Sequence, residues 1–223
     1  MAIDEMLLLS QNAGHSGVLR FYTWEEPSLT AGYFQDIRRV AEIFDAMNKE
    51  LPVVRRLTGG GAVLHGQDLT FSLCLPKRNA FFPTDVKSSY LKVNEAVRAG
   101  LKRDYPAIDY ADCRTAPTGR KRGADTVCFD SPACYDLLLN GRKILGSSQR
   151  RMGGNLLHQA SLFLNSDPAG LAQKIMDGFK QNWKVSFEES AMDSKELQDA
   201  QEIERKRYAS LDWALLRERS FFS

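Results

Sequence analysis

The sequence predicts an α+β fold, with a mixed or antiparallel sheet flanked by helices, and three patterns carry this prediction. Asp68–Leu75 alternates apolar and polar side chains with a period of two, which is typical of a strand with one face in the core. Asn140-Gly141 is a dipeptide favoured in type I′ turns, so Tyr135–Leu139 should fold back onto Arg142–Gly146 as a hairpin. Asp85–Tyr105 repeats apolar residues at helical spacing. Strands and helices that interleave without a repeat or a long linker indicate one mixed domain.

The remaining elements follow from the same two periodicities and from turn residues. Helices are expected at Met1–Gln11, Asp36–Glu50 with Asp36 as its N-cap, Asp85–Tyr105, Pro168–Trp183 and Asp193–Tyr208. Strands are expected at Leu19–Trp24, Ser28–Phe34, Leu51–Leu57 resuming at Ala62–Leu64, and Leu156–Leu164 after a reversal at Gly153-Gly154-Asn155. Cys74 should lie on the more polar face of its strand. The last helix is very polar, so we expect it to face solvent.

The composition is that of an ordinary globular protein. The chain has 223 residues, of which 43% are hydrophobic and 26% charged, so we expect a single domain over residues 1–223 without a separate carboxyl-terminal accessory domain. A net charge of +2 gives no general case for nucleic-acid binding, and no apolar run has the length of a membrane span. The amino-terminal segment lacks the basic region of a secretory signal, so we expect a cytoplasmic location. The four cysteines should then be free thiols.

The most informative segment is R-R-L-T-G-G-G-A-V-L-H at Arg55–His65, because three consecutive glycines are costly unless something approaches the backbone. Bare backbone N–H groups at Gly59–Gly61 could bind a phosphate, a carboxylate or the oxygen of an acyl group. Arg55 and Arg56 beside them favour an anionic ligand. The alternative interpretation is a tight hairpin turn with two solvated arginines.

The hairpin around Asn140-Gly141 singles out a lysine. Its register sets Leu138 opposite Lys143, with Leu145 expected on the same face of the strand and Asp136 as a diagonal neighbour. Lys143 is therefore either an edge residue with its stem on apolar surface or a partly buried amine. Three small residues follow it, and they leave space for a ligand beside the amine: Gly146, Ser147 and Ser148.

These motifs together resemble the lipoate-protein ligase and octanoyltransferase superfamily, whose fold is similar to the catalytic domain of biotin protein ligases. The resemblance covers nearly the whole chain, and it depends on motifs that occur in a fixed order: D-E-M-L-L, L-R-F-Y-T-W, G-Y-F-Q, R-R-L-T-G-G-G-A-V-L-H, D-L-T-F-S, G-R-K-I-L-G-S-S-Q-R-R, H-Q-A and K-R-Y-A-S-L-D-W. The run V-C-F-D-S-P at Val127–Pro132 is similar to that of LipM-type octanoyltransferases, where a cysteine at this place carries the acyl group. In the third motif, H-Q-A replaces the more usual H-G, and the larger residue is expected to narrow the acyl tunnel.

The resemblance implies an acyltransferase with Cys128 as nucleophile and Lys143 stabilising its thiolate. A thiol of ordinary pKa near 8.5 is mostly protonated at neutral pH, so a nearby cation is the physical requirement. The implied reaction moves an octanoyl group from octanoyl-acyl carrier protein to a lysine of a lipoyl domain or of glycine cleavage H protein, as a step of lipoate biosynthesis. Exchange of one thioester for another, followed by amide formation, needs no cofactor and no metal.

The remaining site residues are expected to bind substrate. They are Arg55, Arg56, Thr58, Gly59, Gly60, Gly61, Ala62, Val63, His65, Gly146, Ser147, Ser148, His158 and Ala160. For His65 and His158, a hydrogen-bonded structural role is the alternative. Cys128 likewise has an alternative as a small buried residue, and Cys134 is a rival nucleophile, although packing in its strand is its expected fate.

Two other functions stay open on the sequence. A lipoate-protein ligase would use Lys143 and the glycine-rich segment to hold an acyl adenylate, and it would require ATP and magnesium but no cysteine. A non-catalytic module that binds acyl chains or lipoyl domains would keep the glycines and lose the nucleophile.

Overall fold

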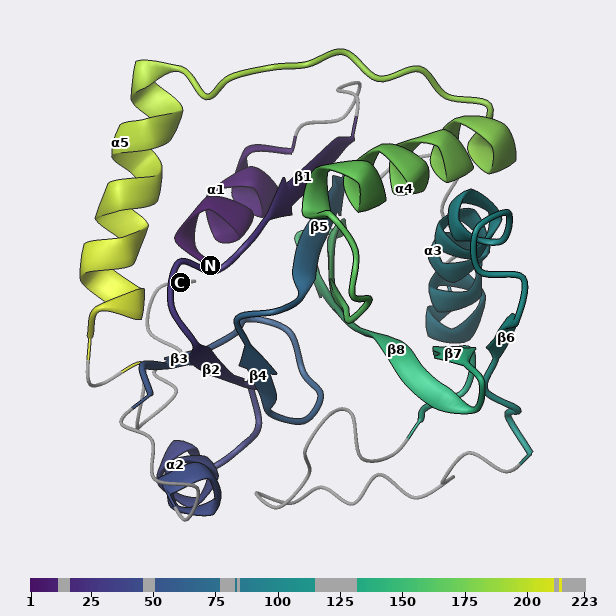
Figure 1. Ribbon diagram of the computed structural model, residues 1–223. Helices are drawn as coiled ribbons and strands as arrows, with labels where there is room; N and C mark the ends of the chain where they lie inside the picture. The colour runs from purple at the N-terminus through teal and green to yellow at the C-terminus, as the bar shows by residue number, and fades with distance from the viewer. Residues whose placement is uncertain are drawn as a thin grey trace.

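The structure, a computed structural model, describes residues 1–11, 17–45, 51–76, 83, 85–114, 132–210 and 213. It has an α+β fold with two sheets and flanking helices (Figure 1), which confirms the predicted class. The large sheet is antiparallel, in the order β1-β5-β9-β8-β7-β6: β1 (Val18–Tyr22), β5 (Leu69–Leu75), β9 (Asn155–Leu162), β8 (Arg142–Met152), β7 (Leu137–Leu139) and β6 (Ile108–Tyr110). The small sheet has the order β3-β2-β4: β3 (Val53–Arg55), β2 (Ser28–Ala31) and β4 (Val63–His65).

The helices lie where periodicity predicted them. They are α1 (Ala2–Ser10), α2 (Ile37–Asp45), α3 (Val86–Leu101), α4 (Pro168–Trp183) and α5 (Ser194–Ile203), which continues into a π-helix at Glu204–Tyr208. Aspartates cap three of them, because the side chains of Asp85, Asp167 and Asp193 accept hydrogen bonds from first-turn backbone N–H groups. The predicted cap Asp36 also accepts one from the N–H of Arg38, at 3.0 Å. No helix in the described part of the chain is both long and apolar enough to cross a membrane.

Helices cover both faces of the large sheet. On one face, α3 and α4 pack together over the main hydrophobic core, while α1 covers the other face and α5 packs against α1 in a second cluster (Figure 1). All seven residues of β5 are consequently buried, and Cys74 lies under α1 with its Sγ 3.8 Å from the carbonyl oxygen of Asp4. Cys74 thus lies on the more polar face of β5, as predicted, but a second helical layer covers this face, so the strand is buried on both sides rather than on one.

The glycine-rich segment is not a hairpin turn. β2 pairs with β3 in parallel and with β4 antiparallel, so β3 and β4 lie on opposite sides of β2. The loop between them crosses the end of β2, and Ala62–Leu64 does not resume the line of β3. At this crossing the backbones nearly touch, because a Cβ on Gly32 would lie 2.0 Å from the carbonyl oxygen of Gly60. Gly60 has a φ of 92°, which favours glycine.

The β7–β8 hairpin has the predicted turn and a bulge that the sequence did not reveal. Asn140 and Gly141 have φ values of 50° and 78°, as a type I′ turn requires, and Leu138 pairs with Lys143 as expected. The next pair is Leu137 with Leu145, so β8 contains one extra residue. Leu137 and Leu145 both lie in the core beneath α3 and α4. Lys143 therefore lies on the opposite face from Leu145, and the expectation that they share a face was wrong.

The structure also corrects the expectation of free cysteines. Cys113 and Cys134 form a disulfide, Cys74 is free and buried, and Cys128 lies outside the described residues. The pairing of β6 with β7 brings the two bonded cysteines together. Beyond these strands the N–H of Tyr135 donates to the carbonyl of Ala111 at 3.3 Å, which continues the close approach of the two segments.

Candidate active site

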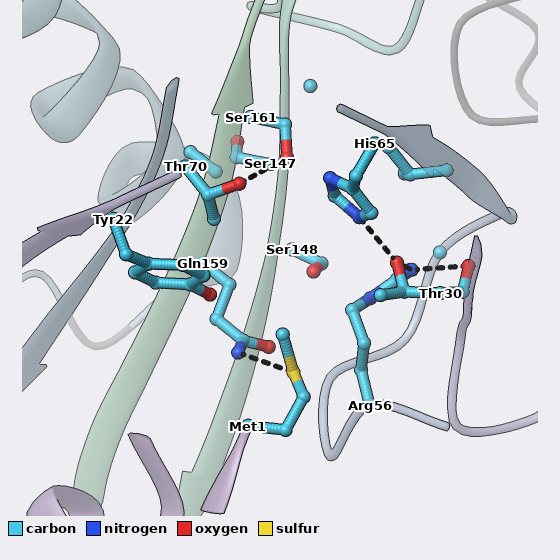
Figure 2. A pocket seen from close by; sticks show the side chains of 14 residues that line it. Met1, Tyr22, Thr30, Arg56, His65, Thr70, Ser147, Ser148, Gln159 and Ser161 are labelled. Atoms are coloured by element: carbon cyan, nitrogen blue, oxygen red, sulfur yellow. Dashed lines mark hydrogen bonds between the residues drawn. The ribbon is translucent and has the colours of Figure 1, made fainter. Parts of the chain in front are cut away.

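A small pocket lies between the two sheets at the amino end of α1 (Figure 2). Its cavity volume is about 30 Å³, so the pocket is small. Eight of the predicted site residues line it: Arg56, Gly60, Val63, His65, Gly146, Ser147, Ser148 and Ala160. The other lining residues were not predicted as site residues, namely Met1, Tyr22, Thr30, Thr70, Gln159 and Ser161. The fold thus brings the glycine loop and the strand that follows Lys143 to one place.

Arg56 determines the shape of the glycine loop. Its guanidinium donates to the carbonyl oxygens of Gly59 and Gly61, at 3.0 and 2.9 Å. It also donates to the carbonyl and the hydroxyl of Thr30, at 3.0 and 2.7 Å. These bonds tie the loop to β2, so Arg56 orders the backbone that a ligand would meet. The side chain is buried, and its charge faces oxygen acceptors of the protein itself.

Arg55 points away from the pocket. The side chain is 1% exposed, and its Nε donates to the carbonyl of Trp213 at 3.1 Å. Its NH1 group donates to three carbonyl oxygens of the turn after β2, those of Gly32, Tyr33 and Gln35. The structure therefore gives Arg55 a scaffold role, and it does not place this arginine among the residues that line the pocket.

His65 joins the loop to a buried aspartate. Its Nδ1 lies 2.8 Å from Asp68 Oδ2 and its Nε2 lies 2.8 Å from Thr30 Oγ1. Burial lowers the pKa of His65 although Asp68 opposes this effect. A neutral ring must donate from Nδ1, because a carboxylate only accepts, so Nε2 accepts from the Thr30 hydroxyl. Trp24 stacks on the imidazole at 4.1 Å between centroids, which fixes the ring.

A buried carboxylate that the sequence analysis did not single out holds the other wall. Asp4, on α1, is fully buried and accepts hydrogen bonds from Arg20, Ser72 and Gln159 at 2.7 to 2.8 Å. Tyr22 adds a fourth at 3.2 Å. Burial opposes ionisation of Asp4, but the amino-terminal ammonium, Arg20 and the hydrogen bonds from Ser72 and Gln159 outweigh it and hold its pKa below the usual value. A signal was present, since an acid within the apolar turns of Ala2–Ser10 needs a buried partner.

Gln159 connects that carboxylate to the glycine loop and to β8. Its Nε2 donates to Asp4 at 2.7 Å, and its Oε1 accepts from the Thr58 hydroxyl at 2.7 Å. Thr58 accepts in turn from the Ser148 hydroxyl at 2.8 Å. Thr58 is thus one hydrogen bond away from the pocket wall, while Gly59, Gly61 and Ala62 act through the loop backbone without lining the pocket.

Lys143 forms an ion pair that is almost completely buried. Its Nζ lies 2.7 Å from Asp136 Oδ2, and each side chain is 4% exposed. Burial raises the pKa of Asp136 although Lys143 opposes this effect. β8 lies between β9 and β7 in the sheet, so the partly buried amine is the correct interpretation and the edge residue is not. The bulge turns Lys143 to the sheet face that carries Gly146 and Ser148. The predicted pairing with Cys128 stays a prediction, since Cys128 is outside the described residues.

His158 lies on the other side of the sheet. It is fully buried, its ring stacks near Phe71 with 6.1 Å between centroids, and its Nδ1 lies 2.9 Å from Gln149 Nε2. Burial lowers the pKa of His158 to about 3, so the ring is neutral at physiological pH. The structure therefore favours the alternative that the sequence left open, a structural histidine. Within the described residues, no three His, Cys, Asp or Glu side chains are grouped as a metal site would need.

Comparison with known proteins agrees with this geometry. Residues 1–206 match the lipoyl protein ligase A/B catalytic domain family. A protein named octanoyltransferase LipM from Moorella thermoacetica is 36% identical over 165 residues, which cover 74% of this chain and 60% of the relative. A second octanoyltransferase LipM, from Kyrpidia tusciae, is 33% identical, with 90% of this chain and 75% of the relative covered.

Solved structures share the fold at lower identity. A lipoate-protein ligase A bound with ATP has a TM-score of 0.76 at 22% identity, covering 96% of this chain and 91% of its own. A bi-partite lipoate protein ligase from Thermoplasma acidophilum, described with its E2 lipoyl domain, has a TM-score of 0.75 at 23% identity, with 98% and 92% covered. From the family match and the similarity to the octanoyltransferases, this chain belongs to the lipoyl protein ligase A/B catalytic domain family.

Proposed function

We propose that this protein transfers an octanoyl group from octanoyl-acyl carrier protein to a lysine of a lipoyl-domain protein, such as glycine cleavage H protein, through a thioester on Cys128. The 33–36% identity to proteins named octanoyltransferases supports octanoyl transfer in lipoate biosynthesis. The observation that carries the mechanism is the ammonium of Lys143, which Asp136 holds on the face of the sheet that bears Gly146 and Ser148.

The first half-reaction needs a thiolate. A free thiol has a pKa near 8.5, and a neighbouring cation favours its ionised form. The Cys128 thiolate attacks the carbonyl carbon of the donor thioester, and the C–O double bond opens to an oxyanion. The backbone N–H groups of Gly60 in the loop and of Gly146 in the strand, which both line the pocket, are the candidate donors to that oxyanion. When the oxyanion collapses, the bond to the carrier sulfur breaks and the carrier leaves as a thiolate that takes up a proton.

The second half-reaction forms the amide. The neutral amine of the acceptor lysine attacks the Cys128 thioester, the carbon–sulfur bond breaks, and the amine loses its extra proton as the thiolate leaves. A thioester is converted into an amide, which is downhill, so the reaction needs neither ATP nor a metal ion. Asp136 contributes by supplying the countercharge that a buried ammonium requires.

The decisive experiment detects the acyl-enzyme. After mixing with octanoyl-acyl carrier protein, intact mass should show one octanoyl adduct that hydroxylamine removes and that peptide mapping assigns to Cys128. Cys128→Ser should lose the adduct and all transfer to a lipoyl domain while keeping its circular dichroism spectrum. Cys74→Ser is the matched control, because burial raises the pKa of the Cys74 thiol and keeps it inert.

The other outcomes separate the alternatives. Full carrier-dependent transfer by Cys128→Ser would overturn the mechanism. Pyrophosphate release from ATP in the presence of octanoate would instead identify an acyl-adenylate ligase, whose fold this chain shares. Octanoyl binding without either activity would identify a binding module.

A further inference from the structure

Gln159 is a residue of the pocket wall whose side-chain amide is held at both ends. Gln159 is 5% exposed, and its Nε2 is bonded to Asp4 while its Oε1 is bonded to Thr58. Both partners are themselves buried, with 0% exposure each. Rotation of Gln159 out of the pocket would remove one donor from a buried carboxylate and leave the Thr58 hydroxyl without its acceptor.

Met1, at the same end of the pocket, is free to change its shape in a way that Gln159 is not. Met1 also lines the pocket, and its thioether lies 3.4 Å from Gln159 Nε2 (Figure 2). An unbranched thioether adapts its shape to a ligand readily. Because the pocket holds only about 30 Å³, an acyl chain must displace some side chain to enter. Met1 can yield at little cost, whereas Gln159 cannot.

The register of β8 separates Gln159 from the proposed reaction centre by about the length of an octanoyl chain together with its thioester link. Ser148 pairs with Gln159, and it lies five residues after Lys143 on the same strand. At about 3.3 Å per residue, with one residue taken up by the bulge, this separation is roughly 13 to 15 Å. An extended octanoyl chain spans roughly 9 Å with carbon–carbon bonds of about 1.5 Å. The difference leaves room for the thioester beside Lys143.

On this face, β8 places no side chain between these two points. Gly146 lies on the same face of β8 between Lys143 and Ser148, and it has no side chain to obstruct a chain running along the strand. Gly146 and its cross-strand partner Ser161 both line the pocket. A fatty chain that begins at Lys143 and follows this path therefore ends against Gln159.

We infer that Gln159, fixed between Asp4 and Thr58, is the specificity-determining residue that limits the acyl chain to about eight carbons. This inference rests on the proposed function and adds its substrate limit. Each further methylene would gain only the burial of one CH₂ group, about fourfold in affinity, while displacing an amide from two buried partners. The wild-type protein should consequently lose efficiency steeply beyond eight carbons.

The test measures kcat/KM for transfer from acyl carrier proteins bearing eight-, ten- and twelve-carbon chains. Shortening the side chain should lengthen the accepted chain in steps, first with Gln159→Asn and then with Gln159→Ala. We expect Gln159→Ala to raise the ratio of ten- to eight-carbon efficiency by about fifteenfold, the value of two additional methylenes at about fourfold each. Gln149→Ala is the matched control, because Gln149 is on the same sheet but bonds Ser89 and His158 on the opposite face, and its ratio should not change.

The outcomes distinguish this inference from the proposed function. A wild-type protein that uses twelve-carbon donors as well as eight-carbon donors would overturn the inference, as would an unchanged ratio in both Gln159 variants. A wild-type protein that transfers no octanoyl group from any carrier would overturn the proposed function instead. If Gln159→Ala does not fold, Gln159→Asn decides the point, because it keeps the amide and shortens the side chain by one methylene.

Discussion

Two adjacent arginines of the glycine-rich motif have different roles, which depend on the direction of each side chain. Arg56 reaches the glycine-loop carbonyls at the pocket, and its neighbour Arg55 reaches the turn after β2 on the other side. Adjacent side chains of extended backbone point in opposite directions, and each guanidinium is bonded to a different part of the protein. At the residue scale, then, one guanidinium orders the pocket and the other orders the scaffold.

His158 gives a test of a buried neutral imidazole. Its pKa in the folded protein is about 3, and an unfolded histidine has a pKa of about 6.5. Between these values the unfolded chain binds a proton that the folded protein does not, so stability falls as pH falls below about 6.5. From pH 7 to pH 5 this costs about 2 kcal/mol. His158→Gln should lose about that much less stability than wild type over this range, as measured by urea denaturation.

The control for that experiment is the absolute stability at pH 7. Removing the ring from its contacts with Phe71 and Tyr90 should lower the stability of His158→Gln at pH 7, where proton uptake plays no part. Only the change with pH reports the titration. Equal pH dependence in the two proteins would show that His158 is protonated in the folded state.

At the scale of elements, the β-bulge in β8 decides the chemistry. Without it Lys143 would share the face of Leu145 and be buried in the core beneath α3 and α4. One additional residue reverses the alternation, so the ammonium lies on the pocket side of the sheet and meets Asp136. The turn at Asn140-Gly141 was predictable from its dipeptide. The bulge was not predictable, because nothing in the local sequence shows which residue of β8 lacks a partner on β7.

A second feature at the scale of elements is the disulfide next to the β6–β7 pair. It joins Cys113 and Cys134, which are 21 residues apart. In oxidising buffer, peptide mapping without reductant should recover these two cysteines as one linked pair. A cross-link of this spacing stabilises a protein by about 3 kcal/mol, so adding reductant should lower the Tm by roughly 6 to 12 °C.

Cys113→Ser provides the control for the disulfide. Its Tm should match that of the reduced wild-type protein and should not respond to reductant. Two alkylated peptides in place of a linked pair, with equal Tm values with and without reductant, would contradict the disulfide.

For the whole molecule, one side chain joins segments that are far apart in sequence. Arg55 bonds the turn after β2 and the carbonyl of Trp213, and the Trp213 indole donates back to the Arg55 carbonyl at 3.1 Å. Arg55→Met would leave several buried carbonyls without donors and should cost about 3 kcal/mol. The expected fall in Tm is roughly 6 to 12 °C.

The matched control is another arginine whose charge faces solvent. Arg39 pairs with Glu42 on α2, and both side chains are more than half exposed, at 56% and 65%. Arg39→Met should leave the Tm nearly unchanged, because exposed ion pairs contribute little. If Arg55→Met were as stable as Arg39→Met, water would be replacing the guanidinium without loss of stability, and the expectation for Arg55 would be wrong.

The sequence by itself determined the elements of this protein, its α+β class and the motifs of its family, because periodicity, caps and turn dipeptides act over a few residues. It placed the helices at α3 and α4 and the register of Leu138 with Lys143. Only the tertiary structure decided which face Lys143 occupies, that Asp4 anchors Gln159, and that Cys113 joins Cys134. Each of these depends on a contact between distant segments, and a buried charge or amide acquires its role from partners that local sequence does not specify.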